Sequence, residues 1–489
     1  MLREFSVALA GNVDAALRAH LIREDGDEDL AFALWTPSRG ATRLTALVHT
    51  LVLPEEGDRQ VHGNVSFNQQ YLDRVCRLAL AQGLGVAFLH SHPYPGWQDM
   101  SWDDVVAEKR LAGPVVALTE LPLVGLTLGS DGAWSARFWE HEDGRSYEKH
   151  WCAVVRVLDS RLRLSYANQV LPRPALRDLF RRTLSVWGPD AHADLARLRI
   201  GIVGLGSVGA LVAETIARMG VTRFALIDFD RVEPHNLDRL VTATEDDIGR
   251  LKVEVAQDRV RAVATATTVD VIAAPYSVVE ESGYRAVLDC DVIFCCVDRP
   301  RARHVLNHFA YGHLIPVIDG GIAVRFKNQR FSGVDWQVQT VGPGRPCLEC
   351  LGTYDQADVS TEAAGMLDDP SYLKGLPQDH RLKRNENVFP FSANVASLEV
   401  LQLIALATGA AGVPEFGVQR YRYNPGILEQ LPAQECRSHC DQPRLIGQGD
   451  RYFCLVGRDG AAERSRLKVS LDHTVSPSPT RQPLASSGQ

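Results

Sequence analysis

At 489 residues, the chain is longer than one ordinary hydrophobic core supports, so two domains or slightly more are expected. Hydrophobic residues make up 45% and charged residues 23% of the sequence, the proportions of a globular protein. The formal net charge of -8 offers no basic field, which argues against nucleic acid as a partner. No apolar run reaches 18 residues and the opening residues do not resemble a signal peptide, so we expect a cytoplasmic protein without a membrane partner.

The first 145 residues alternate short apolar runs with polar turns, which predicts a small α/β domain. Helical spacing of apolar residues predicts helices at about 13–23 and 68–82. The candidate strands are 30–35, 43–53, 84–89 and 114–119. An arginine- and leucine-rich stretch over 146–190 then predicts a helical connector.

From residue 199 the rhythm changes to strand, glycine turn, helix, strand, which is typical of a Rossmann-like, doubly wound parallel sheet. We assign this α/β domain to residues 191–445. Its candidate strands are 199–203, 223–227, 268–273, 291–297 and 315–318. Residues 352–390 lose this rhythm and predict a long surface excursion. Residues 446–489 predict a C-terminal extension that is disordered from about 474, where Ser-Pro repeats begin.

The first chemical constellation follows the predicted strand at 84–89. His90 and His92 are separated by one residue, so on an extended chain both rings point to the same side and can bind one metal ion. Asp104, at the start of a predicted helix, supplies a third ligand and leaves a fourth position for water, as in a catalytic zinc site. Glu28, just before an apolar strand, is the candidate general base.

These residues resemble the JAMM (MPN) metalloprotease family, whose pattern is His-x-His-Pro, then Ser-x-x-Asp, with an upstream glutamate. The resemblance implies that His90, His92 and Asp104 bind zinc, that Glu28 activates water, and that Ser101 supports the tetrahedral intermediate. Members cleave isopeptide or peptide bonds after the C-terminal glycine of ubiquitin-like proteins. Because the spacing to Ser101 is one residue longer than usual, Asp99 and Asp103 remain alternative ligands, and Glu55 or Glu56 an alternative base.

The second constellation is a glycine turn between a strand and a helix. Gly204, Gly206 and Gly209 let the backbone approach a phosphate chain at a helix N-terminus. Asp228 ends the next strand about twenty residues on, where a carboxylate binds ribose hydroxyls. These features alone fit a dinucleotide as well as ATP, so a dehydrogenase is the competing interpretation.

The residues after Asp228 favour ATP. Asn236, Arg239 and Lys252 place an amide and two cations where a departing pyrophosphate needs them and a nicotinamide does not. Asp298 follows a later apolar strand at the ligand-binding edge of the sheet, where a carboxylate can hold Mg²⁺ on the phosphates.

This order, Asp-x-Asp, Asn-Leu-x-Arg, Lys and a later Asp, resembles the ThiF/MoeB and ubiquitin-activating-enzyme superfamily. The resemblance implies adenylation of a C-terminal glycine carboxylate, with Asp228 and Asp230 at the ribose end, Asn236, Arg239 and Lys252 on the phosphates, and Asp298 on magnesium. It also implies a homodimer.

The ten cysteines are expected to be reduced thiols or metal ligands, because disulfides are rare in the cytoplasm. Two close pairs resemble the structural zinc site of the same superfamily: Cys347 with Cys350, and Cys436 with Cys440. His439 is an alternative to Cys440 as the fourth ligand.

Two features depart from the superfamily pattern. Residues 351–435 contain no cysteine for a thioester, and Cys454 is the only later one outside the pairs. Asn168 occupies the position of an arginine that reaches across the dimer, for which Arg161 or Arg163 are possible substitutes.

The combined expectation is a bifunctional enzyme that processes and activates one ubiquitin-like protein, with ATP, Mg²⁺ and two Zn²⁺ ions as cofactors. A conjugating enzyme or a sulfur donor is the further expected partner. Such a fusion resembles bacterial ubiquitin-like conjugation operons, some linked to phage defence. The alternatives are sulfur-carrier activation to a thiocarboxylate for cofactor, cysteine or siderophore synthesis, and a binding scaffold in which one domain is inactive.

Overall fold

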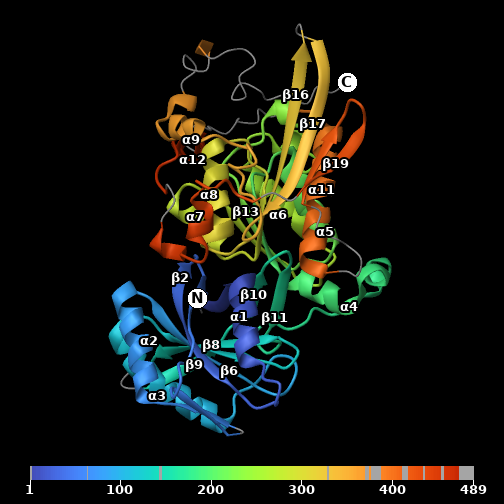
Figure 1. Cartoon of the computed structure of the whole chain (residues 1–489). Helices are drawn as coiled ribbons and strands as arrows, with labels where there is room; N and C mark the ends of the chain where they lie inside the picture. Colours follow the sequence, from blue (N-terminus) through green and yellow to red (C-terminus); the bar gives the residue numbers. More distant parts are fainter. Residues whose placement is uncertain are drawn as a thin grey trace, which may run out of the picture.

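The computed structural model describes residues 3–62, 64–142, 146–327, 330–368, 374–375, 387–409, 417–432, 435–452 and 456–472. Two large sheets organise these residues, one in each half of the chain. In Figure 1 the N-terminal half, in blue to teal, lies below the C-terminal half. The expected tail from about 474 lies outside the described residues, as do residues 369–373 and 376–386 of the excursion expected at 352–390.

The N-terminal sheet has nine strands, with the parallel pair β1 and β3 near its centre. In spatial order they are β11 (Leu162–Tyr166), β10 (Val154–Leu158), β1 (Glu4–Ala10), β3 (Arg43–Val52), β2 (Leu30–Arg39), β6 (Gly85–Ser91), β7 (Leu123–Leu128), β8 (Trp134–His141) and β9 (Tyr147–Trp151). A small hairpin, β4 (Arg59–His62) with β5 (Asn64–Phe67), stands apart from this sheet.

Helices cover both faces of the N-terminal sheet. α1 (Gly11–Leu21) packs Leu17 and Leu21 on one face. α2 (Gln69–Gln82) and α3 (Trp102–Thr119) bury Val75 and Leu111 on the other. The expected helices at 13–23 and 68–82 are therefore present, close to the predicted boundaries.

Two sequence-based expectations are wrong. Residues 114–119 are the end of α3, not a strand, because a helix started by Ser101 continues through Pro114 and turns Leu111 and Val115 to the core at helical spacing. The region 146–166 forms β9, β10 and β11 instead of a helical connector. The run Val154–Leu158 is fully buried, and its β-branched side chains favour a strand in the interior of the sheet. Helix in this region is confined to its end, where α4 (Arg181–Arg197) begins.

The C-terminal sheet has eight strands and is parallel on one side and antiparallel on the other. Its order is β14 (Asp270–Ala274), β13 (Arg223–Ile227), β12 (Arg199–Val203), β15 (Val292–Cys295), β16 (Val317–Lys327), β17 (Arg330–Val341), β18 (Val418–Arg422) and β19 (Ile427–Leu431). The strand order, and not the strand direction, reverses between the parallel neighbours β12 and β15. Ligands of such sheets bind outside the carboxyl ends of the strands at this point, and we call this region the crevice.

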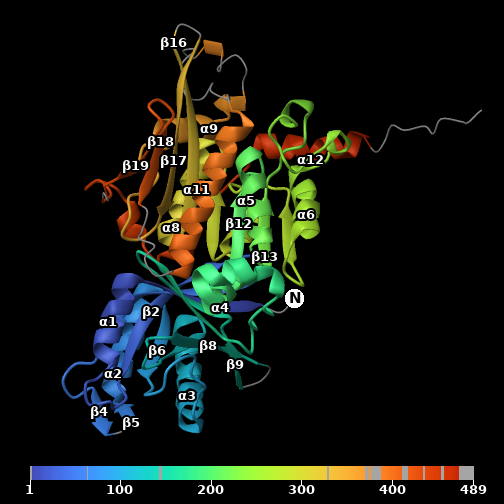
Figure 2. The same ribbon diagram turned by 90° about the vertical axis from the view of Figure 1, so that its right-hand side faces the viewer.

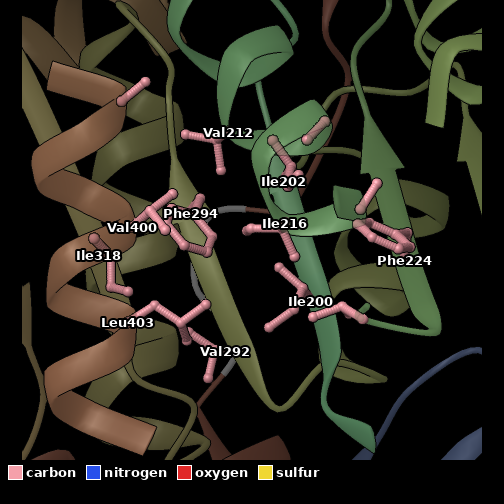
Figure 3. Close-up of a cluster of buried hydrophobic side chains, with 14 of the residues drawn as sticks. Ile200, Ile202, Val212, Ile216, Phe224, Val292, Phe294, Ile318, Val400 and Leu403 are labelled. Carbon is pink, nitrogen blue, oxygen red and sulfur yellow. The ribbon is translucent and has the colours of Figure 1, made fainter. Parts of the chain in front are cut away.

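Helices also cover both faces of this sheet (Figures 1 and 2). One face carries α5 (Ser207–Arg218), α6 (Lys252–Val263) and α11 (Phe389–Thr408), and the other α7 (Glu281–Leu288) and α8 (Pro300–Gly312). Figure 3 shows the first of these cores, where Ile216 of α5 and Leu403 of α11 meet Ile202, Phe294 and neighbouring strand residues. This packing accounts for the continuous apolar strands, since both faces are buried.

Among the described residues, α11 is the one helix long and apolar enough to cross a membrane by length and composition. Half of its most apolar window is buried inside the structure. Val395, Val400, Leu403 and Leu406 belong to the core of the C-terminal sheet, and a buried core helix passes the same test.

A buried cluster of charges joins the two halves. Asp291, before β15, accepts hydrogen bonds from Arg43 Nη1 at 2.6 Å and Arg156 Nη1 at 2.8 Å, both from the N-terminal sheet. In a further pair the carboxylate comes from the N-terminal half and the arginine from the C-terminal half: Glu4 of β1 lies 2.9 Å from Arg223 Nη1. These ion pairs are buried and hydrogen-bonded on both sides, so the two halves form one packed unit.

This interface places the two predicted sites at ends of the molecule that face away from each other. Leu30, at one end of β2, pairs with His90, whereas Arg39, at the other end, contacts Asp450 of the C-terminal half. β2 spans about 30 Å between those ends. β12 and β13 begin at the interface and run away from it towards the glycine turn.

Candidate functional site

Two histidines and a carboxylate meet at the end of β6. The Nε2 atoms of His90 and His92 lie 3.1 Å apart. Asp104 places Oδ1 3.5 Å from His90 Nε2 and Oδ2 3.4 Å from His92 Nε2. Ligands on a tetrahedral zinc with bonds of about 2.0–2.1 Å are separated by about 3.4 Å. The three side chains therefore fit one zinc ion and leave its fourth position open.

The local fold explains why these residues meet. His90 lies near the end of β6, and His92 directly follows the strand, where its N–H donates to Leu128 O at 2.9 Å. Two residues apart on an extended chain, both rings lie on the same side. Ser101 caps α3 by accepting a hydrogen bond from Asp104 N at 3.1 Å, and Asp104 Oδ2 accepts one from Ser101 N at 2.8 Å. Burial raises the pKa of Asp104, but hydrogen bonds from His90 and His92 more than reverse this and hold it well below its usual range.

The candidate base Glu28 lies beside this cluster, with Oε1 4.0 Å from His92 Nε2. Burial raises the pKa of Glu28, which favours a group that can take up a proton. The neighbouring Asp29 fixes the segment, because its N–H donates to Ser91 Oγ at 3.0 Å and its carboxylate pairs with Arg59 Nε at 2.6 Å.

The structure separates the expected residues from their alternatives. Asp104, and neither Asp99 nor Asp103, joins the histidines in the group that can hold a metal. Glu55 pairs with Arg74 instead of approaching the histidines. The capping contact of Ser101 uses its hydroxyl as an acceptor, which leaves the O–H to donate to a further group.

Behind the histidines lies a buried polar chain that sequence reasoning missed. Thr127 Oγ1 of β7 is 3.4 Å from His90 Nε2 and accepts a hydrogen bond from Arg137 Nη1 at 2.6 Å. Arg137 also donates through Nε to Glu108 Oε2 at 2.9 Å, and both side chains are fully buried. Glu108 lies one turn after Asp104 on α3, so this pair anchors the helix that carries the third ligand. Trp139 Nε1 completes the chain by donating to Glu108 at 2.7 Å.

The glycine turn has the close contacts that its pattern predicts. Gly204 has φ +90°, and a Cβ there would lie 2.6 Å from the carbonyl oxygen of Cys296. A Cβ on Gly209 would lie 1.9 Å from the carbonyl oxygen of Gly204. A Cβ on Gly206, in contrast, would meet no described atom within 4 Å. The open side of the turn is thus at Gly206, where a phosphate can approach the start of α5.

Carboxylates and a lysine gather beside this turn at the carboxyl edge of the sheet. Asp228 accepts hydrogen bonds from Leu205 N at 2.6 Å and Asp230 N at 2.7 Å. Lys252 Nζ lies 2.9 Å from Asp230 Oδ2. The negative charge of the exposed Asp298 also contributes to raising the pKa of Lys252. Burial, and then the charge of Asp230, raise the pKa of Asp228 to about 6. Burial lowers the pKa of Lys252, but the charges of Asp228 and Asp230 raise it by more, so the net shift is upward and Lys252 is cationic.

The other two predicted phosphate ligands make local contacts. Asn236 Oδ1 accepts a hydrogen bond from Glu233 N at 3.1 Å. Arg239 Nη1 donates to His235 O at 2.7 Å and to Asp238 Oδ1 at 2.8 Å. Both lie on the turn that follows Asp230, so they flank the edge without joining the Asp228–Lys252 group.

A second unpredicted network lies under the crevice. Arg303 of α8 donates to Val297 O at 3.1 Å and Gly320 O at 3.0 Å, which ties the segment before Asp298 to β16. Asp319 lies 3.4 Å from Arg303 Nε. Burial raises the pKa of Glu399 well above its usual value, and its carboxyl group contacts Cys296 Sγ at 3.7 Å.

The four paired cysteines converge although about 85 residues separate the pairs in the sequence. Their sulfur atoms all lie within 4.8 Å of one another, and Cys347 Sγ is 3.7 Å from Cys440 Sγ. Sulfur atoms around a tetrahedral zinc with bonds of about 2.3 Å are separated by about 3.8 Å. Backbone N–H groups also point at these sulfurs, from Cys350 to Cys347 and from Arg437 to Cys350, both at 3.4 Å. Cys440, and not His439, completes the group.

The residues considered for a contact across a dimer lie in or next to β10 and β11. Asn168 accepts a hydrogen bond from Arg197 at 2.8 Å, and Arg163 pairs with Asp14 and Asp159 at 2.9 Å. Arg161 is exposed at the turn between β10 and β11. Cys454 lies outside the described residues.

Comparison with known proteins places a family in the C-terminal half. The profile of the ThiF family matches residues 180–441, more than half of the chain. SAMP-activating enzyme E1 of Haloferax volcanii is 31% identical over 164 residues, which cover 34% of this chain and 57% of that protein. The tRNA threonylcarbamoyladenosine dehydratase of Escherichia coli is 32% identical over 152 residues, 30% of this chain and 54% of that protein. The chain thus spans little more than half the length of these relatives.

Among solved structures, E. coli MccB with ATP aligns with 55% of this chain and 74% of its own, at 17% identity and a TM-score of 0.40.

Proposed function

The chain belongs to the ThiF family, and on that premise we propose that its C-terminal half uses ATP to adenylate the C-terminal glycine carboxylate of a ubiquitin-like protein. One observation carries this proposal: the open glycine turn, Asp228, Lys252 and Asp298 meet at one edge of the sheet. Ligands bind at such an edge where the strand order reverses. The net charge of -8 favours a protein substrate over a tRNA.

Each part of this edge has a task in the proposed reaction. Backbone N–H groups at Gly206 receive phosphate oxygens, and the Asp228 carboxylate accepts hydrogen bonds from ribose hydroxyls. The substrate carboxylate attacks the α-phosphorus, the bond to the β-phosphate oxygen breaks, and an acyl-adenylate and pyrophosphate result. Lys252 and Arg239 offset the negative charge that develops on the phosphates. Asp298 would hold Mg²⁺, which adds positive charge at the same oxygens.

For the N-terminal half we propose a JAMM-type metallo-isopeptidase that acts on the same ubiquitin-like protein. The 3.1–3.5 Å spacing of His90, His92 and Asp104 supports a catalytic zinc, which when bound makes a water molecule acidic. Glu28 would take up the proton of that water and deliver it to the leaving amine. The Ser101 hydroxyl would donate a hydrogen bond to the oxygen of the tetrahedral intermediate. The cleaved product would end in the glycine that the other half activates.

For the four cysteines we propose a structural zinc site. All four positions of such a site are filled by protein sulfur, so it has no place for a reacting group. It would tie the loop after β17 to the segment before Gln442 and so brace the crevice.

A second candidate function, sulfur-carrier activation, is favoured by the lack of any cysteine in residues 351–435. A thioester on the crossing segment is then impossible, and the adenylate would pass to a thiol of another protein or to a sulfur donor. Conjugation and sulfur transfer share the adenylate and differ only in the acceptor. Adding a persulfide donor or a conjugating enzyme to the activated protein distinguishes them.

ATP–pyrophosphate exchange tests the proposed adenylation. The full chain is incubated with ATP, Mg²⁺, labelled pyrophosphate and small proteins that end in glycine. We expect exchange that depends on the small protein and is lost in Asp298→Ala and Arg239→Ala, while Glu28→Ala exchanges normally. In a matched cleavage assay with a C-terminally extended substrate, Glu28→Ala should be inactive but retain its metal, and Asp298→Ala should be active. Exchange without any small protein, or none with every candidate, would argue against the proposal.

A further inference from the structure

A C-terminal helix lies against the nucleotide edge of the sheet. α12 (Gly460–Asp472) follows the last residue matched by the ThiF profile, so it is an addition to that domain. Figure 2 shows it next to α9 (Gln356–Ala363) and above α6. Ala462 is completely buried, so the helix is packed against the domain. We propose that α12 is part of the ATP site and that Ser465 and Arg466 are positioning residues for its ribose end.

The first contact is with the turn that carries the ribose carboxylate. Ser465 Oγ donates to Phe229 O at 2.5 Å, and Arg231 Nε donates to Ser465 O at 3.3 Å. Phe229 lies between Asp228 and Asp230, whose side chains face the glycine turn and Lys252. α12 thus holds this turn from behind while its carboxylates face the crevice.

The second contact is with the loop after the neighbouring strand. Arg466 makes a two-pronged ion pair with Glu280, at 2.6 and 2.9 Å, and donates to Pro275 O at 3.1 Å. Its guanidinium also lies 4.8 Å from the ring centre of Tyr276. β14 and β13 are adjacent, so Arg466 fixes the loop next to the Asp228 turn. This bidentate geometry restricts orientation more than a single contact would.

The third contact reaches the opposite side of the crevice. Arg464 Nη2 pairs with Asp368 at 2.8 Å, and Asp368 lies 3.4 Å from Arg299, the residue after Asp298. Arg301 Nη1 donates to the carbonyl oxygen of Arg458 at 3.0 Å. The segment from Arg458 to Arg466 therefore spans from the magnesium side to the ribose side. This segment would hold the carboxylates of Asp228 and Asp298 at a fixed separation before ATP binds. Less conformational entropy would then be lost on binding.

The inference rests on the proposed ATP site, and its test separates the two. Binding of Mg·ATP to the full chain is measured by calorimetry for wild type, Arg466→Met and Ser465→Ala. We expect Arg466→Met to weaken binding about tenfold and Ser465→Ala to weaken it by a smaller factor, in the usual range for coupling between a distant contact and a site. Arg422→Met is the matched control, because it removes an arginine ion pair with Glu429, between β18 and β19, that contacts neither loop.

Steady-state kinetics distinguish positioning from general damage. Arg466→Met should raise the KM for ATP about tenfold and leave both kcat and the KM for the small protein close to wild type. Arg466→Lys keeps the charge but not the two-pronged contact, so its KM for ATP should lie between those of wild type and Arg466→Met. A lower kcat with unchanged KM, or ATP binding equal to wild type in both Arg466→Met and Ser465→Ala, would overturn the role of α12 alone. A wild-type chain that does not bind ATP would overturn the proposed function and this inference together.

Discussion

Arg43 of the N-terminal sheet and Asp291 of the C-terminal sheet form a buried ion pair across the boundary of the two halves, 2.6 Å from Nη1 to Oδ1. Arg156 shares the same carboxylate oxygen. Burial raises the pKa of Asp291, yet the surrounding arginines reverse this and hold it well below its usual range. The carboxylate is thus charged across the physiological pH range and is one of several groups that join the two halves.

Breaking this pair should destabilise the whole chain. Arg43→Met leaves Asp291 with a buried, partly unpaired charge, and we expect a loss of about 3–5 kcal/mol in the free energy of unfolding, measured by urea denaturation. The two halves should unfold together in wild type. Arg173→Ala removes an exposed ion pair with Asp190 and should cost less than about 1 kcal/mol. An Arg43→Met protein as stable as the control would mean that the halves are held together elsewhere.

The two metal sites should respond differently to loss of a ligand. We expect two zinc ions per chain by elemental analysis, and one each in His92→Ala and Cys350→Ser. Only Cys350→Ser should lower the melting temperature markedly, because a closed four-sulfur site couples metal binding to folding. His92→Ala should abolish cleavage and leave pyrophosphate exchange intact. Two ions retained in His92→Ala would rule out the histidine site.

Thr127 should influence zinc affinity without binding the ion. Its hydroxyl accepts a hydrogen bond from Arg137 Nη1, so Thr127→Val removes a partner of the Arg137–Glu108 pair, which anchors the helix that carries Asp104. Outer contacts of this kind typically contribute 10–100-fold to metal affinity, and we expect a loss of about tenfold in competition with a chelator. Thr119→Val, at the far end of α3, is the control. Equal affinities in the two variants would show that the buried chain has no influence on the metal.

The raised pKa of Asp228 predicts a pH dependence for ATP binding. In the proposed site the carboxylate would accept hydrogen bonds from ribose hydroxyls, so its ionised form should bind ATP better than its neutral form. With a pKa of about 6, affinity should be constant above pH 7 and fall as the pH drops through 6. Asp228→Asn should bind more weakly at pH 8 and lack this transition. An affinity in wild type that rises on acidification would contradict the assignment of Asp228.

Sequence patterns predicted the parts of the sites that follow from local geometry. Asp228 and Asp298 each follow a parallel strand, and such strands end at the same edge, so their proximity could be inferred without a structure. His90 and His92 share a side because an extended chain alternates. Cys347 and Cys436 are brought together over a long separation, but their pairing was foreseen from their number and spacing.

Other features had no local signal. Glu108 and Arg137, or Arg466 and Glu280, carry no motif, and their partnership appears only when distant elements pack. The short apolar run at 114–119 predicts a strand, whereas the start signal of the helix that contains it, at Ser101, lies more than a dozen residues earlier. The arginine- and leucine-rich composition of residues 146–190 predicts helix, but Arg156 is buried against Asp291 and residues 147–166 form strands.

Intact mass spectrometry of the small protein detects the proposed adenylate directly. The full chain is mixed with Mg·ATP and a small protein that ends in glycine, and the small protein is weighed before any thiol is added. We expect a new species heavier by one adenylate, with release of pyrophosphate, that is absent with Asp298→Ala and with a small protein whose terminal glycine is amidated. An unmodified small protein under all conditions, together with a nicotinamide or flavin bound in the crevice, would contradict it.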